Sequence, residues 1–170
     1  MLTLKSSAFR DASEIPKDFT GEGLDKSPPL AWESRSDRTQ QFALLCEDPD
    51  APQSEPFVHW LLYNIPANIK SLPEAIPEEA DLESPFKAQQ GMNSTGKIGY
   101  IGPMPPVGHG WHRYYFKLFA LDQELNLKAG LGKAEFLEAI RTHILAECDL
   151  VGRYQRVAEE KKSQSQEARN

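Results

Sequence analysis

Proline is the residue that most constrains what this chain can fold into. Thirteen of its 170 residues are prolines, and most of them fall between apolar runs. A proline fixes its own φ, has no backbone N–H, and pushes the preceding residue into an extended conformation. This spacing predicts short strands that are joined by shaped loops.

Apolar runs of strand length predict most of the secondary structure. The run QFALLCED alternates, which places Cys46 and Asp48 on one face. The run FVHWLLYNI is apolar on both faces and is expected at the centre of a sheet. Alternation in this run makes His59 face the same way as Leu61 and Tyr63. The expected strands are residues 2–9, 41–48, 57–65, 87–92, 113–121 and 146–157.

One segment has a helical period, and two have the composition of loops. Leu137 and Ile144 lie on one apolar stripe of residues 133–145, which predicts a helix there. Turn-forming residues fill 20–32, and prolines and acidic residues fill 66–85, so both segments are expected to be connections. The chain is therefore expected to be mostly β with one or two helices.

The length suits one domain with a single core, which we expect to span residues 1–157. Residues 158–170 are charged and have no apolar face, so they are expected to be a solvated helix end or a disordered tail. No apolar run approaches the roughly 18 residues of a membrane span. The N-terminus lacks the features of a signal peptide, and a cytoplasmic location is expected.

Charge and cysteine content narrow the class of protein. The net charge is −6 and there is no basic block, so no nucleic-acid partner is expected. Two cysteines, Cys46 and Cys148, are too few and too far apart for a disulfide framework or a zinc knuckle. They are expected to be buried or half-buried thiols, and the sequence leaves a single bridge between them open.

Candidate binding residues lie at strand ends and inside strands. Asp48 and Asp50 belong to the sequence CEDPDAP, whose two prolines make a rigid strand exit. The alternative role for these aspartates is to accept backbone N–H groups within a turn. His59 lies in an otherwise apolar strand, where a buried imidazole needs a polar partner.

The loop GPMPPVGHGWHRY has the features of a pocket wall. Glycines such as Gly102 permit tight backbone turns, and the proline pair that ends at Pro106 is stiff. His112 and Tyr114 begin the next strand on one face, roughly 7 Å apart by strand rise. His109 is expected to be solvated and to take no part in the pocket.

These motifs resemble those of a known family. DPDAP at 48–52, VHW at 58–60, SPPLAW at 27–32 and GPMPPVGHGWHRY at 102–114 resemble signatures of the phosphatidylethanolamine-binding proteins. The chain is similar in particular to their prokaryotic Raf kinase inhibitor-like branch, from about Thr3 to about Arg156. The resemblance implies a β-sandwich of two sheets with a few peripheral helices. It also implies a small pocket for anionic head groups.

Motif matching assigns the pocket residue by residue. It puts Asp48 and His59 on one side, Pro106 on the wall, and His112 and Tyr114 on the other side. The second aspartate of DPDAP is expected at least partly to hold the loop. The predicted ligand-binding residues are Asp48, Asp50, His59, Gly102, Pro106, His112 and Tyr114.

The chemistry expected of this pocket is anion binding. Two protonated imidazoles beside one carboxylate leave one net positive charge, which suits a phosphate, a phosphoryl head group or a carboxylate. Binding is expected to be tightest below the ordinary histidine pKa of about 6.5. No cofactor is expected. The family suggests a regulatory, kinase-inhibitor-like role with a protein partner such as a kinase, and by analogy a homodimer.

Two alternatives use the same residues. A hydrolase could use His59 or His112 as a base with Asp48 as orienter, but no serine or cysteine lies in a recognisable nucleophile elbow. Cys46, two residues before Asp48, leaves a thiol nucleophile open. A metal-dependent enzyme could use His109 and His112 as ligands together with His59 and Asp48. The sequence HGWH, however, lacks the helical spacing of a zinc protease. We therefore expect no catalytic residue and no metal ligand.

Overall fold

The computed structural model describes residues 1–158, which form two antiparallel sheets, one α-helix and one 3-10 turn. The smaller sheet has the order β1 (Leu2–Lys5), β2 (Leu30–Ser34) and β5 (Ser71–Leu72). The larger sheet has the order β6 (Asp81–Leu82), β7 (Ala88–Gln90), β4 (Phe57–Pro66), β3 (Gln41–Asp48), β8 (His112–Leu121) and β9 (Ile144–Tyr154). The turn is η1 (Lys17–Phe19) and the helix is α1 (Lys133–Ile140).

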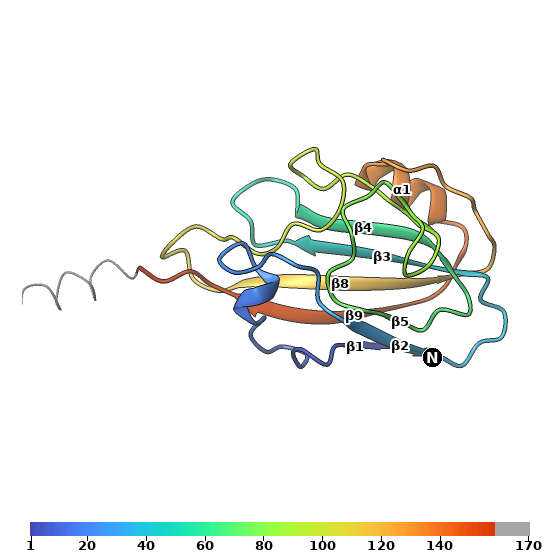
Figure 1. Cartoon of the computed structure of the whole chain (residues 1–170), viewed down its shortest axis with the longest axis horizontal. Coiled ribbons are helices and arrows are strands. Elements are labelled where there is room, and N and C mark those ends of the chain that lie inside the picture. Colours follow the sequence, from blue (N-terminus) through green and yellow to red (C-terminus); the bar gives the residue numbers. More distant parts are fainter. Residues whose placement is uncertain (159–170) are drawn as a thin grey trace, which may run out of the picture.

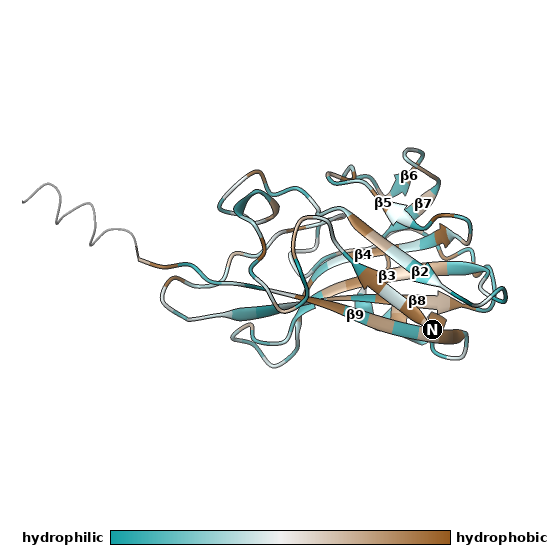
Figure 2. Cartoon of the chain, turned by 90° about the horizontal axis from the view of Figure 1, so that it is seen from below, coloured by the Kyte–Doolittle hydropathy of each residue, from teal (hydrophilic) through white to brown (hydrophobic). Residues whose placement is uncertain are grey.

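The larger sheet is covered on both faces, and β3 is its most buried strand. Every residue of β3 is buried. Phe42 and Leu44 face the smaller sheet, whereas Ala43 and Leu45 belong to the cluster under α1. Figure 1 shows α1 and the smaller sheet on opposite sides of the larger sheet, and Figure 2 shows the smaller sheet in front of it. The two-sheet, mostly-β architecture is therefore confirmed.

The antiparallel order brings three strand ends together at one end of the larger sheet. β3 ends at Asp48, β4 begins at Phe57 and β8 begins at His112. β3 pairs with β4 on one side and with β8 on the other, so these three ends are neighbours. The loops at 49–56 and 102–111 extend from this end, on the left in Figure 1.

The strands β3, β4 and β8 match the sequence prediction closely, but other boundaries differ. The last predicted strand ends at Tyr154 rather than at residue 157, and β7 covers Ala88–Gln90 rather than 87–92. The first strand ends at Lys5 rather than at residue 9. The predicted helix ends at Ile140, and Ile144 already belongs to β9, where it pairs with Leu121. Pairing of β9 along the whole of β8 overrides the apolar stripe that predicted five more helical residues.

The two segments predicted to be connections contain short strands. Leu30 begins β2, which pairs with β1, so SPPLAW ends inside the smaller sheet. The segment 66–85 contains β5 and β6, whose two-residue lengths are too short to give a periodic signal. Of the one or two predicted helices, the described residues contain α1 alone, with η1 as a single turn.

Three further predictions concern the cysteines, membrane-spanning segments and the C-terminal tail. Cys46 is a buried free thiol and Cys148 is a half-buried one, as expected, and no bridge joins them. No helix within residues 1–158 is long and apolar enough to cross a membrane. The predicted tail falls almost entirely on 159–170, outside the described residues.

Gln90 ties β7, β4 and the loop before β6 together, and its replacement should destabilise the fold. Its side chain is fully buried, accepts a hydrogen bond from Trp60 Nε1 at 2.7 Å, and donates to the carbonyls of Pro77 and Glu79. We expect Gln90→Leu to leave these groups unpaired and to lower the free energy of unfolding by about 3 kcal/mol. Urea denaturation measures this, with the exposed Gln123→Leu as control. Equal stability of the two variants would contradict the assignment.

Candidate functional site

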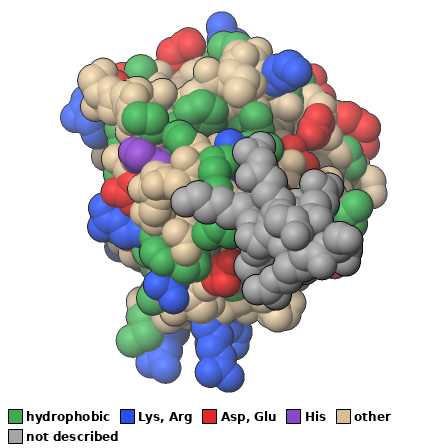
Figure 3. All heavy atoms as spheres, turned by 90° about the vertical axis from the view of Figure 1, so that its left-hand side faces the viewer, with side chains coloured by type: hydrophobic (Ala, Val, Ile, Leu, Met, Phe, Trp, Pro, Cys, Tyr) green, Lys and Arg blue, Asp and Glu red, His purple; other side chains and the backbone are tan. Residues whose placement is uncertain are grey.

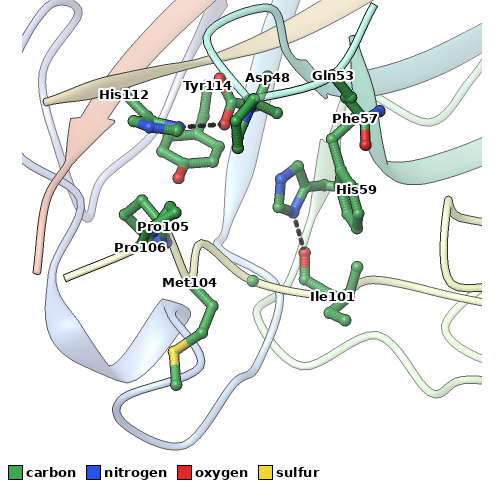
Figure 4. A pocket seen from close by; sticks show the side chains of 13 residues that line it. Asp48, Gln53, Phe57, His59, Ile101, Met104, Pro105, Pro106, His112 and Tyr114 are labelled. Carbon is green, nitrogen blue, oxygen red and sulfur yellow. Dashed lines mark hydrogen bonds and ion pairs between the residues drawn. The ribbon is translucent and has the colours of Figure 1, made fainter. Parts of the chain in front are cut away.

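A small cavity lies where the ends of β3, β4 and β8 meet. Its volume is about 250 Å³, below the roughly 300–1,000 Å³ of typical ligand pockets, so it suits a small ligand. Figure 3 views the molecule from this end, where histidine atoms reach the surface among hydrophobic side chains. Figure 4 shows the lining at close range. The polar side chains that line the cavity are Asp48, Gln53, His59, His112 and Tyr114.

Asp48 is a buried carboxylate with both oxygens engaged. Its side chain is 4% exposed, and Oδ2 lies 2.6 Å from His112 Nδ1. Oδ1 accepts the backbone N–H of Asp50 at 2.7 Å. Oδ1 thus forms the predicted turn, and Oδ2 forms the predicted contact with a histidine. Asp48 has both roles because each role uses a different oxygen. The carboxylate fixes the orientation of the His112 ring.

His109 lies beside His112 and extends this hydrogen-bonded row to the surface. Its Nδ1 lies 2.6 Å from His112 Nε2, and the two ring centroids are 4.8 Å apart. His109 is exposed and is not among the cavity-lining residues, as expected, but its hydrogen bond to His112 connects it to the cavity wall. The sequence does place His109 three residues before His112, but this spacing does not predict a contact. Glycines let the loop adopt many conformations, so the distance between the two rings is set only by the folded loop.

A β-bulge turns His59 toward the cavity. Cys46 pairs with Trp60 and Glu47 pairs with Val58, so His59 is an extra residue opposite β3. The alternation that placed His59 with Leu61 and Tyr63 is therefore wrong. Its ring lies 5.1 Å from that of Tyr114, in an edge-to-face arrangement on the side of β4 that faces the smaller sheet.

The protonation state of His59 is set by burial. The residue is 5% exposed, and its Nδ1 lies 2.6 Å from the carbonyl oxygen of Ile101. Burial lowers the pKa of His59 to about 4, because desolvation outweighs the hydrogen bond to Ile101 and the nearby Asp48 carboxylate. His59 is therefore neutral at neutral pH, and it does not supply the second positive charge expected from the sequence.

Tyr114 contributes a hydroxyl group to the cavity. Tyr114 and His112 lie on one face of β8 as predicted, with ring centroids 6.5 Å apart. Burial and the Asp48 carboxylate raise the pKa of Tyr114, so its hydroxyl stays protonated. Figure 4 shows this hydroxyl directed toward Pro105 and Pro106 across the cavity. It is therefore available as a hydrogen-bond donor.

Asp50 supports the site from outside the cavity. Its carboxylate accepts two hydrogen bonds from the Arg113 guanidinium and one from the Arg113 backbone N–H, each at 2.9 Å. Hydrogen bonds from the Arg113 side chain lower the pKa of Asp50. Asp50 is not among the cavity-lining residues, and its hydrogen bonds to Arg113 give it the predicted loop-holding role. Arg113, which the sequence reasoning missed, joins the loop after β3 to the start of β8.

Gly102 lines the cavity, but its backbone N–H is already used. That N–H donates to Asp25 Oδ1 at 2.7 Å. A Cβ built on Gly102 would lie 2.6 Å from the Phe19 carbonyl oxygen and 2.8 Å from Thr20 Cα. The glycine is thus required for close packing against η1 and the turn after it.

The predicted proline wall is present, and further apolar side chains line the cavity beside it. Pro105 lines the cavity together with Pro106, and both lack a backbone N–H. The sequence reasoning missed the apolar part of the lining because those side chains come from three separate segments. They include Phe57, whose ring lies 4.7 Å from that of His59. The other missed apolar lining residues are Ala51, Pro52, Ile101 and Met104.

The comparisons with known proteins agree on one family. The family described as phosphatidylethanolamine-binding protein matches residues 5–155. A UPF0098 protein of Pyrococcus horikoshii is 43% identical over 89% of this chain and 75% of its own length. A UPF0098 protein of Methanothermobacter thermautotrophicus is also 43% identical, over 91% of this chain and 99% of its own length.

Two solved structures have the same fold. A putative phosphatidylethanolamine-binding protein homologue from Chlamydia trachomatis superposes with a TM-score of 0.81 at 35% identity, covering 91% of this chain and 97% of the other. YbcL of Escherichia coli, described as a new member of the mammalian family, has a TM-score of 0.83 at 28% identity, covering 91% and 98%.

Acid should destabilise the protein partly through His59. The unfolded chain binds a proton at this residue with a pKa near 6.5, whereas the folded protein binds it near 4. Stability is therefore kept above about pH 6.5 and lost as the pH falls toward 4, by about 2–3 kcal/mol at pH 4.5. Urea denaturation at pH 7 and 4.5 should show a smaller acid loss in His59→Gln. The control His143→Gln, at a surface pair with Asp122, should behave like the wild type. An unchanged loss in His59→Gln would show that His59 is protonated in the folded state.

Substitution of Gly102 should be costly although alanine is small. We expect Gly102→Ala to lower the free energy of unfolding by about 2 kcal/mol, because the added Cβ meets backbone atoms that cannot move aside individually. Gly132→Ala is the matched control, since a Cβ there meets no atom within 4 Å. Thermal denaturation of both variants provides the measurement. A tolerated Gly102→Ala would mean that the loop shifts freely.

Proposed function

Because the chain belongs to the phosphatidylethanolamine-binding protein family, we propose that its cavity binds a small anion, such as phosphate or a phosphoryl head group. The observation that carries this proposal is the hydrogen-bonded row of Asp48, His112 and His109 at the cavity wall. A row of this kind can take up a proton from solvent, which cancels the negative charge of Asp48 beside the cavity.

The charge of the row Asp48–His112–His109 depends on how many protons its side chains hold. At 2.6 Å, one nitrogen between His112 and His109 donates and the other accepts, so one proton lies between them. A second proton lies between His112 and Asp48, because a carboxylate only accepts. One more proton makes the histidine pair cationic, and the exposed His109 gives it access to solvent. Because the Asp48 carboxylate is negative, this proton takes the row from one net negative charge to zero, which removes the repulsion of an anion.

The other features of the cavity support a small ligand. The Tyr114 hydroxyl provides a donor, and the remaining lining is largely apolar, with Phe57, Ile101 and the proline wall. Such a lining excludes water and strengthens each polar contact with the ligand. The volume of about 250 Å³ leaves room for a phosphoryl group with a short substituent.

We infer binding rather than catalysis. Cys46, the thiol closest in sequence to Asp48, is 1% exposed, and burial raises its pKa. A thiol in that setting is not a nucleophile. Residues 1–158 also contain no group of three or more side chains suited to holding a metal ion. A hydrolase or metal-dependent role therefore has less support than anion binding.

A regulatory role with a protein partner such as a kinase rests on family membership alone, because one fold supports many functions. The homodimer and the cytoplasmic location likewise remain predictions from family and sequence.

Anion binding through the histidine pair should depend on pH. A proton added to the pair favours the anion, so affinity should be higher at acidic than at alkaline pH. Isothermal titration calorimetry with inorganic phosphate should give an affinity at least about fivefold higher at pH 5.5 than at pH 8. His112→Gln should remove most of this difference, and His143→Gln should keep it. Equal affinities at the two pH values would refute the role of the pair.

A further inference from the structure

The hydrogen bond from His59 to Ile101 fixes which ring nitrogen carries hydrogen. Nδ1 lies 2.6 Å from the carbonyl oxygen of Ile101. A carbonyl oxygen only accepts, so Nδ1 must donate its N–H. Figure 4 shows the other ring nitrogen, Nε2, turned away from Ile101 and directed into the cavity.

Nε2 carries a lone pair when the ring is neutral, and the surroundings keep the ring neutral. His59 is 5% exposed, with the Phe57 ring 4.7 Å and the Tyr114 ring 5.1 Å away between centroids. Two charged or titratable side chains act on it, Asp48 from β3 and His112 from β8, and they have opposite effects on its pKa. Desolvation therefore decides the outcome, and Nε2 is a hydrogen-bond acceptor at neutral pH.

No hydrogen bond to Nε2 is formed by the described residues. The hydrogen bond to Ile101 uses the opposite nitrogen. Tyr114, whose ring meets the imidazole edge to face, has its hydroxyl in the cavity and forms no hydrogen bond with the imidazole. A nitrogen acceptor that is more than nine-tenths buried and directed into a cavity implies a ligand that donates to it.

We propose that the ligand of this cavity is an anion that keeps an O–H on its anionic group, and that His59 selects it by accepting a hydrogen bond from that O–H. Hydrogenphosphate, phosphonate monoanions and singly protonated phosphate monoesters have this chemistry. This inference rests on the proposed function, anion binding in the same cavity.

The same reasoning names the anions that the cavity should reject. Sulfate, sulfonates and the phosphodiester group of a phospholipid have only acceptor oxygens on the anionic group. In such an anion an oxygen lone pair would face the Nε2 lone pair, and the buried acceptor would stay unpaired. Sites built around a hydrogen bond to a ligand O–H reject analogues that lack it more strongly than apolar pockets reject a missing methyl group.

Two isosteric anions test the inference directly. At pH 6.0 methylphosphonate and methanesulfonate both carry one negative charge and have nearly the same shape, but only methylphosphonate has an O–H. Isothermal titration calorimetry on the full chain should show methylphosphonate binding at least about tenfold more tightly. O-phosphorylethanolamine, a phosphate monoester, should likewise bind more tightly than glycerophosphoethanolamine, a phosphodiester. This comparison shows whether the ligand of the cavity is a free monoester or the head group of a phospholipid.

The outcomes separate this inference from the proposed function. If methanesulfonate binds as tightly as methylphosphonate, His59 does not select the proton and the inference is wrong, while anion binding stands. If neither anion binds, nor inorganic phosphate, the proposed function fails and the inference fails with it. His59→Leu should reduce the preference to less than about threefold by removing the acceptor. His143→Leu should keep the wild-type preference.

A spectroscopic measurement keeps the test independent of whether His59→Leu folds. In the ¹⁵N-labelled wild-type protein at pH 7, we expect the His59 Nε2 resonance to have the chemical shift of an unprotonated nitrogen. Methylphosphonate should move this resonance in the direction of hydrogen bonding, and methanesulfonate should leave it unchanged. A protonated Nε2 in the free protein would overturn the inference.

Discussion

The burial of β3 on both faces is the constraint on which the rest of the structure depends. A strand with no exposed residue must lie inside a sheet that is itself covered on both sides, here by the smaller sheet and by α1. Such a strand has little freedom to slip, because a shift of one residue would exchange its two apolar faces. Asp48 at its end is therefore held in place by the whole core. The Asp48 carboxylate in turn fixes the position of His112 in the cavity wall.

Much of the fold could be predicted because its signals are local. Proline stops and apolar alternation set the ends of β3, β4 and β8 to within about a residue. The common face of His112 and Tyr114 follows from the period of two along a strand, and the structure shows their rings 6.5 Å apart. Local patterns predicted the wrong structure where long-range strand pairing competed with them. The apolar period extended the predicted helix past Ile140, whereas Ile144 pairs with Leu121 as part of β9.

The finer parts of the site depend on contacts that no local pattern encodes. Arg113 and Asp50 are 63 residues apart in the sequence, and Gly102 and Asp25 are 77 apart. The bulge at His59 depends on how β4 pairs with β3, and simple alternation assigns the wrong face when a strand contains an extra residue. Family motifs named six residues that line the cavity, and Asp50, which does not line it. They did not distinguish those that line the cavity from those that support it.

The wall of the cavity formed by Pro105 and Pro106 has a consequence for substitutions in the cavity. Many anion sites use several backbone N–H groups, which every amino acid except proline provides, so their specificity survives most substitutions. Pro105 and Pro106 present no such donor, so the proposed anion binding depends on the side chains of His59, His112 and Tyr114. Under the proposed function, a substitution at one of these three side chains would change which anion the cavity binds, because the proline backbone cannot compensate with an N–H.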